Sequence, residues 1–127
     1  MVKKMTDNLS YVRAYRSTLK GRVSRFLSKI KHRAATARLA FNLDRDWFIS
    51  RFKNGCCEVT GLPFDFRAGK HPNTPSVDRI DSIQGYTKDN CQLVIWIYNA
   101  AKQNYGAENV LQMANALIDI QQTGICA

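Results

Sequence analysis

The stretch PSVDRIDSIQGYTKDNCQLVIWIYNAAK, residues 75–102, decides the fold of this chain. It predicts two short strands, over 75–80 and 92–95, that are joined by a polar loop with a glycine. A helix from Trp96 to about Tyr105 is expected after the second strand. Two strands and a helix in this order predict a β-hairpin that folds back on a helix.

Two polar side chains in this stretch are suited to a hard divalent cation. Asp78 ends the first expected strand, and Asn99 lies in the expected helix. Carboxylate and amide oxygens are ligands that Mg²⁺ and Mn²⁺ prefer. Phosphodiester hydrolysis uses such a cation to neutralise charge on the scissile phosphate and on the leaving oxygen. The pair therefore predicts a metal-binding phosphate site, although Asp78 could also pair with Arg79 and Asn99 could be a surface amide.

The order and spacing of motifs over 57–102 resemble those of the HNH, or His-Me finger, endonucleases. The matching elements are Cys57-x-x-Thr60-Gly61, Asp78-Arg79-Ile80, Gly85-Tyr86, Asp89-Asn90, Leu93-Val94 and Asn99-x-x-Lys102. They look most like small phage and bacterial HNH-like proteins with the motifs S-x-D-R-I-D, G-Y and D-N-x-Q. The resemblance implies an α+β fold, with a ββα-metal (HNH-like) hairpin-and-helix centre. We expect a basic N-terminal helical arm and a C-terminal helix beside it.

The resemblance also implies roles for three residues and a cofactor. Asp78 corresponds to the metal-binding acid, Asn99 to the last metal ligand, and Asn90 to the asparagine that pins the loop and orients the base. Mg²⁺ or Mn²⁺ is the implied cofactor. Asn90 could equally be a turn residue that caps its own loop. Thr60 stands where the first zinc knuckle of many family members has its second cysteine, so no structural zinc is expected.

Arg79 stands where the family carries its general-base histidine. A guanidinium stays protonated at neutral pH, so it cannot take a proton from water. It can bind a phosphate through two hydrogen bonds, which predicts an electrostatic role for Arg79. If cleavage occurs, the base must be Asp81, His71 or a metal-bound hydroxide. Asp81 could instead start the turn, and His71 could be a solvated loop side chain.

The positive charge is concentrated in the first part of the chain. Residues 1–53 carry 14 Lys and Arg against three acids, a balance of +11, whereas residues 54–127 carry five against seven, a balance of −2, so that the net charge is +9. This distribution favours a polyanionic partner over a solvated surface, which usually mixes charges of both signs.

Apolar residues recur at three- and four-residue steps from Asn8 to about Ala40, which predicts an amphipathic helix that Gly21 could split into two. Cations flank this apolar stripe. The residues expected to contact nucleic acid are Arg13, Arg16, Lys20, Arg22, Arg25, Lys29, Lys31, Arg33 and Arg38, together with Lys102.

Two further helices are expected. One runs from Asp44 to about Lys53, with Asn42 as a candidate cap and its aromatic side chains in the core. The other runs from Ala107 to Gln121 and is expected to pack on the hairpin-and-helix centre.

Together these features predict a basic helical DNA-binding arm over 1–53 and an HNH-like nuclease domain over 54–127. The expected activity is metal-dependent endonucleolytic hydrolysis of duplex or structured DNA. An HNH-fold DNA-binding protein without catalysis is the alternative, and a basic partner of RNA or of an acidic protein is a third possibility. Two copies could act as a homodimer. No apolar run approaches a membrane span. We therefore expect no membrane partner and a cytoplasmic location, in a bacterial or phage-infected host cell.

Overall fold

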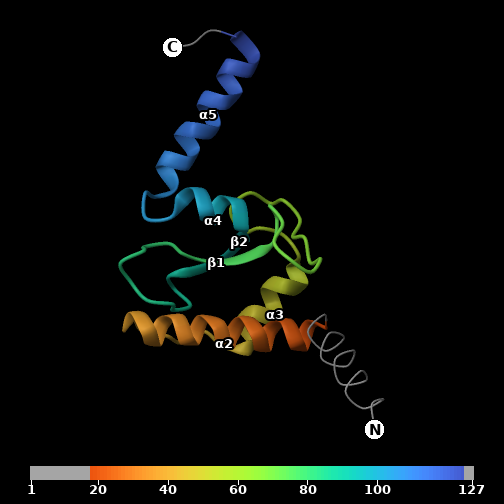
Figure 1. Ribbon diagram of the computed structural model, residues 1–127, viewed down its shortest axis with the longest axis vertical. Coiled ribbons are helices and arrows are strands. Elements are labelled where there is room, and N and C mark those ends of the chain that lie inside the picture. The colour runs from red at the N-terminus through yellow and green to blue at the C-terminus, as the bar shows by residue number, and fades with distance from the viewer. Residues whose placement is uncertain (1–17, 125–127) are drawn as a thin grey trace, which may run out of the picture.

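The computed structural model describes residues 18–124 as a small α+β fold with one antiparallel two-stranded sheet and four helices in this part of the chain (Figure 1). In chain order the elements are α2 (Leu19–Ala37), α3 (Arg45–Asn54), β1 (Pro75–Arg79), β2 (Cys91–Ile95), α4 (Trp96–Lys102) and α5 (Ala107–Thr123). In Figure 1, α2 and α3 lie on one side of the hairpin and α4 lies on the other.

The β1–β2 hairpin has the expected strands, within one residue at their ends. Pro75 pairs with Ile95, and Asp78 pairs with Gln92. Leu93 and Val94 are neighbours in β2 and point to opposite faces of the sheet, yet neither has any exposed surface. Both faces of this small sheet are therefore covered, with α4 on one side and α2 and α3 on the other.

The helix α2 packs into the common core, mainly against α3, through a narrow apolar stripe. Val23, Ile30 and Ala34 are buried and recur at helical spacing. The threonine before the helix caps it by accepting a hydrogen bond from the Gly21 backbone at 3.1 Å. Gly21 thus lies in the first turn of the described helix. The earlier part of the expected helix, residues 8–17, lies outside the described residues.

The helix α3 begins at a different cap from the expected one. Asp44 accepts a hydrogen bond from the Trp47 backbone at 2.9 Å, so Asp44 is the cap and the expectation for Asn42 is wrong. The side chain of Asn42 instead accepts a hydrogen bond from the Lys88 backbone at 2.8 Å. The aromatic face of α3 is in the core as expected, with Phe48 fully buried.

Side chains from α2, α3 and both strands form one buried core. Residues before and after position 53 both contribute to this core. The expected division at that position, into a DNA-binding arm and a nuclease domain, therefore stays a prediction about function. Cys91 is part of this core, and burial raises the pKa of its thiol to about 12. It is therefore a small buried side chain.

The last two helices differ from expectation. α4 ends at Lys102, before the expected Tyr105, because Gln103 has a φ of 39° and leaves the helical conformation. α5 has no buried residue, and only its start contacts the core, through Val110. The expected packing of this helix on the hairpin-and-helix centre is present at its start, beside α4, and not along the rest of its length. Figure 1 shows α5 extending away from the body. Within residues 18–124, no helix is both long and apolar enough to cross a membrane.

Gly85 is required where the hairpin loop meets the segment between α2 and α3. The Tyr86 backbone donates to the Ala40 carbonyl at 2.9 Å, and a Cβ added at Gly85 would lie 2.8 Å from the Ala40 nitrogen and closer still to the Ala40 oxygen. We expect Gly85→Ala to lower the free energy of unfolding by about 1–3 kcal/mol, because two backbones would have to separate. Urea unfolding measures this change. Ser82→Ala in the same loop is the control, and an unchanged midpoint for Gly85→Ala would show that the loop does not pack as described.

Candidate functional site

Asp78 is a buried carboxylate at the junction of β1 and α4. Only 3% of its surface is exposed. The side chain of Gln92, its partner across the hairpin, donates to Asp78 Oδ2 at 2.9 Å. A buried carboxylate is stable only when its charge is compensated, so a cation has to lie beside it.

That cation is the ammonium of Lys102, the last residue of α4. Its Nζ lies 2.8 Å and 3.0 Å from the two carboxylate oxygens of Asp78. It also lies 2.6 Å from the carbonyl oxygen of Arg79 and 3.4 Å from that of Ile80. Lys102 is 4% exposed. The expectation that Lys102 faces a DNA phosphate is therefore corrected, because its charge is directed into the protein.

Asn99 ties α4 to β1. Its side-chain nitrogen donates to Ser76 Oγ at 2.8 Å and to the Val77 carbonyl at 3.1 Å. Because that nitrogen faces the strand, the amide oxygen is the atom of Asn99 that could bind a metal. The structure thus brings Asn99 to the same strand–helix junction as Asp78.

Asn90 holds the loop between the two strands together. Its oxygen accepts from the Asp81 backbone at 2.9 Å, and its nitrogen donates to the carbonyls of Asp81 and Gly85 at 3.0 and 2.9 Å. The carboxylate of Asp81 accepts from the Ile83 backbone at 3.0 Å and from Gln84 Nε2 at 3.1 Å. Asp81 therefore has the contacts of a residue that starts the turn.

Arg79 lies over its own loop. One guanidinium nitrogen donates to the Gln84 carbonyl at 3.1 Å, and the guanidinium carbon lies 4.9 Å from the centre of the Tyr86 ring. His71 has local contacts as well, with Nε2 3.0 Å from the Ala68 carbonyl. Among the described residues, side-chain hydrogen bonds to the Asp78 carboxylate come from Lys102 and Gln92 alone. The two side chains suggested as bases, Asp81 and His71, thus make other contacts in this structure.

A metal at this junction would need ligands other than clustered acids. Within residues 18–124, no three His, Cys, Asp or Glu side chains gather closely enough to hold a metal ion. Asp78 would have to share the ion with amide, main-chain, water or phosphate oxygens, all of which suit Mg²⁺ and Mn²⁺.

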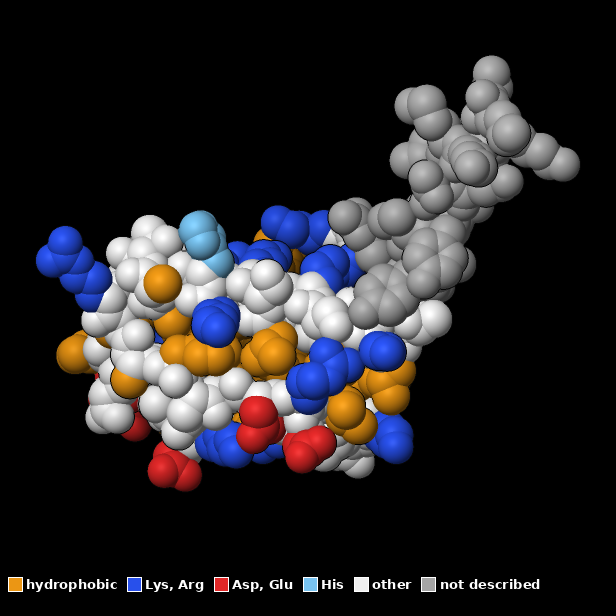
Figure 2. All heavy atoms as spheres, turned by 90° about the horizontal axis from the view of Figure 1, so that it is seen from below, with side chains coloured by type: hydrophobic (Ala, Val, Ile, Leu, Met, Phe, Trp, Pro, Cys, Tyr) orange, Lys and Arg blue, Asp and Glu red, His pale blue; other side chains and the backbone are white. Residues whose placement is uncertain are grey.

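The outer face of α2 carries a dense group of cations. The pKa of Lys29 is lowered by partial burial and then by the positive charges of Arg33, Arg25 and Lys70. We name Arg25, Lys29, Arg33 and Lys70 the α2 cation cluster. Lys70 comes from the loop before β1 and was not among the expected DNA-binding residues. Figure 2, which views the molecule from the α2 side, shows Lys and Arg side chains spread over this face.

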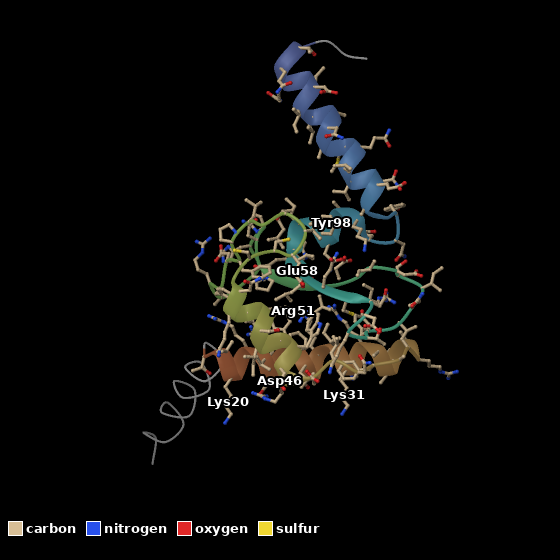
Figure 3. All side chains as sticks on the ribbon, turned by 180° about the vertical axis from the view of Figure 1, so that it is seen from behind. Lys20, Lys31, Asp46, Arg51, Glu58 and Tyr98 are labelled. Carbon is tan, nitrogen blue, oxygen red and sulfur yellow. The ribbon has the colours of Figure 1, made fainter. Side chains whose placement is uncertain are left out.

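The other cations of the expected arm have different positions. Lys20, Lys31 and Arg38 are exposed, and Lys20 and Lys31 point away from the body in Figure 3. Arg22 is half-buried, with its guanidinium carbon 4.5 Å from the centre of the Phe66 ring. The remaining two expected residues, Arg13 and Arg16, lie outside the described residues.

Comparisons with known proteins bear on the fold. No model of a known protein family matches the chain, and no curated protein matches it. The structure is similar to that of the rare-cutting HNH restriction endonuclease PacI, an enzyme described as perturbing DNA, with a TM-score of 0.56 and 19% sequence identity. The match covers 82% of this chain and 82% of that one. The chain thus has an HNH-like fold, as its motifs indicated.

Proposed function

We propose that this chain is a metal-dependent endonuclease that hydrolyses phosphodiester bonds in DNA at the junction of β1 and α4. The observation that carries the proposal is the position of Asp78. A carboxylate of the type that binds Mg²⁺ is fixed, nearly without exposed surface, at the strand–helix junction of an HNH-like fold. A net charge of +9 supports DNA as the partner.

The residues at the junction fit a hard divalent cation. Asp78 offers a carboxylate, and Asn99 offers an amide oxygen because its nitrogen is held by β1. A bound Mg²⁺ or Mn²⁺ would supply charge neutralisation at the scissile phosphate and at the leaving oxygen. Asp78 and Asn99 are therefore the proposed metal ligands of this chain.

The loop between β1 and β2 holds Arg79, a further residue of the proposed site. Asn90 fixes the two ends of the loop, and the loop in turn holds the Arg79 guanidinium. We propose that Arg79 leaves its neutral carbonyl partner to bind the phosphate, which is a stronger acceptor because it is charged. A water bound to the cation is the proposed nucleophile, since Asp81 is engaged in the turn.

The α2 cation cluster is the proposed contact with the DNA backbone. Changing Arg25, Lys29 and Arg33 together to glutamine should make the negative slope of log K against log salt shallower by roughly 2–3, because each lost phosphate contact contributes about −0.9 to that slope. The matched control changes Lys20, Lys31 and Arg38 to glutamine, which removes the same charge from another side of α2 and from the residue that caps its end. We expect the slope of the control to become shallower by a smaller amount. Equal slopes for both triple variants would contradict a localised contact at the cluster.

An HNH-fold DNA-binding protein without catalysis is the second candidate. Arg79 favours it, because no described side chain replaces the missing histidine at Asp78. Incubation with supercoiled plasmid in Mg²⁺, in Mn²⁺ and in EDTA separates the two functions, provided that DNA binding is measured in the same buffers. Nicking in a metal buffer but not in EDTA supports the nuclease, whereas equal binding without nicking in any buffer supports the second candidate.

A further inference from the structure

The ammonium of Lys102 is held in a cage of oxygen atoms. Both carboxylate oxygens of Asp78 and the carbonyl oxygens of Arg79 and Ile80 lie between 2.6 and 3.4 Å from Nζ. Three N–H donors face four acceptors, so the ammonium is fully satisfied. Carboxylate and carbonyl oxygens are also the donors that hard divalent cations select.

We propose that Lys102 is an internal cation that occupies the metal position, so that a divalent ion binds Asp78 only when the ammonium leaves. The inference rests on the proposed metal-dependent function and adds a regulatory step to it. Without a metal, the Lys102 ammonium fills the site and donates hydrogen bonds to its oxygen atoms. The more stable these contacts are, the more they weaken metal binding.

The position of Lys102 makes such an exchange feasible. It is the last residue of α4, and the chain leaves the helix at Gln103. Its charge is carried on a flexible four-carbon stem, so the ammonium can move while the backbone of α4 stays in place. Asp78 has no comparable freedom, because it lies within β1 and also accepts a hydrogen bond from Gln92.

A titration with Mn²⁺ alone, without DNA, tests the exchange. Free Mn²⁺ is measured by electron paramagnetic resonance for the wild type, for Lys102→Met and for Lys102→Gln. Each substitution removes the competing charge, so we expect Mn²⁺ to bind about tenfold or more tightly. Adding Asp78→Asn to Lys102→Met should remove this binding. Lys88→Met is the matched control, because Lys88 is an exposed lysine paired with Asp44, and its Mn²⁺ affinity should equal that of the wild type.

Thermal unfolding with and without Mn²⁺ gives a second readout. Mn²⁺ should raise the midpoint of Lys102→Met more than that of the wild type, since ligand that binds the folded state stabilises it in proportion to its affinity. Both folded Lys102 variants could bind Mn²⁺ no more tightly than the wild type, while Asp78→Asn abolishes the binding. That result would overturn this inference and leave the proposed function standing. Absence of Mn²⁺ binding in every variant would overturn both.

The exposed side of α5 carries a second, independent inference. Leu111, Met113, Leu117 and Ile118 are between 51% and 62% exposed, although they are large apolar residues. A helix of this length is only marginally stable on its own in water, so a partner that covers this side is expected. The charged residues of α5 are Glu108 and Asp119, with no Lys or Arg, so DNA does not suit this surface.

Two pairs of apolar residues in α5 are placed symmetrically about Ala114. Leu111 and Leu117 lie three residues on either side of it, and Val110 and Ile118 lie four residues on either side. We infer that α5 pairs in an antiparallel manner with α5 of a second copy of this chain. Leu111 of one copy would then lie against Leu117 of the other, with the small Ala114 side chains at the two-fold axis. At about 100° per residue, Glu108 and Asp119 fall on the far side of the helix, so their like charges do not meet.

Mass measurement by light scattering after size-exclusion chromatography tests the pairing. The wild type should have the mass of two chains, and a double variant with Leu111→Gln and Leu117→Gln should have the mass of one. Gln112→Ala, on the side of the acids, is the control and should stay at two chains. A single-chain mass for the wild type, or a two-chain mass for the double variant, would overturn the inference.

Discussion

Lys102→Met is expected to lower the free energy of unfolding by about 3–5 kcal/mol, because it leaves the buried carboxylate of Asp78 without a compensating charge. The wild-type pair is 4% and 3% exposed, so water cannot take over the role of the lysine without opening the junction of β1 and α4. The carbonyl oxygens of Arg79 and Ile80 lose a donor as well. Urea unfolding followed by circular dichroism measures the change.

Two controls make this result specific to the buried pair. Lys88→Met removes an exposed lysine and should change stability little, because exposed ion pairs contribute little. A double variant with Lys102→Met and Asp78→Asn should be more stable than the sum of the two single changes predicts, since neither charge is then buried alone. Additive losses would mean that the two side chains do not interact in the folded protein.

The hairpin could be predicted from sequence because its signals are local. Two short strand-like segments, a glycine in the loop between them and a helix directly after the second strand are all read along 75–102, and the structure has these elements in this order. The motifs in the same stretch indicated an HNH-like fold, which the similarity to the solved HNH enzyme confirms. The roles of Asp78, Asn90 and Asn99 stay predictions.

The partner of Lys102 could not be predicted in the same way. Helical spacing places Lys102 on the same side of α4 as Asn99, but it does not tell whether that side meets solvent or a strand. The answer depends on how α4 packs on β1, which brings together residues 24 positions apart. A buried lysine is rare, so a solvent-facing one was the better expectation from sequence.

Two other differences have the same cause. Lys70 joins the α2 cation cluster only because the loop before β1 folds against α2, and no periodic pattern marks it. The apolar side of α5 indicated a packed helix, and the pattern itself was correct. Periodicity shows that a helix has an apolar side, but it does not show which surface covers that side.

Asp78→Asn is expected to lower the rate of metal-dependent DNA cleavage by about a thousandfold, which corresponds to roughly 4 kcal/mol of transition-state stabilisation. The amide retains the size of the carboxylate but loses the charge that holds a divalent cation. DNA affinity should change little, because the α2 cation cluster lies on a different element. The exposed carboxylate of Asp89, in the loop between β1 and β2, provides the matched control as Asp89→Asn.

The loss of charge at Asp78 also leaves the ammonium of Lys102 buried without its partner, so a cleavage defect could arise from unfolding. Circular dichroism of Asp78→Asn at the assay temperature checks this. Asn99→Ala is the second variant, since it removes the other proposed ligand and leaves the ion pair of Asp78 and Lys102 in place. A cleavage defect in both folded variants would locate the loss of activity at the proposed metal site.

The most direct measurement is therefore the rate of plasmid nicking in Mn²⁺ by the wild type and by Asp78→Asn, at protein concentrations that bind the same fraction of the DNA. The proposed function predicts nicking by the wild type that EDTA abolishes, and a loss of about a thousandfold in Asp78→Asn with Asp89→Asn unaffected. Equal nicking by the wild type and by folded Asp78→Asn, or nicking that persists in EDTA, would contradict a metal-dependent nuclease site at Asp78.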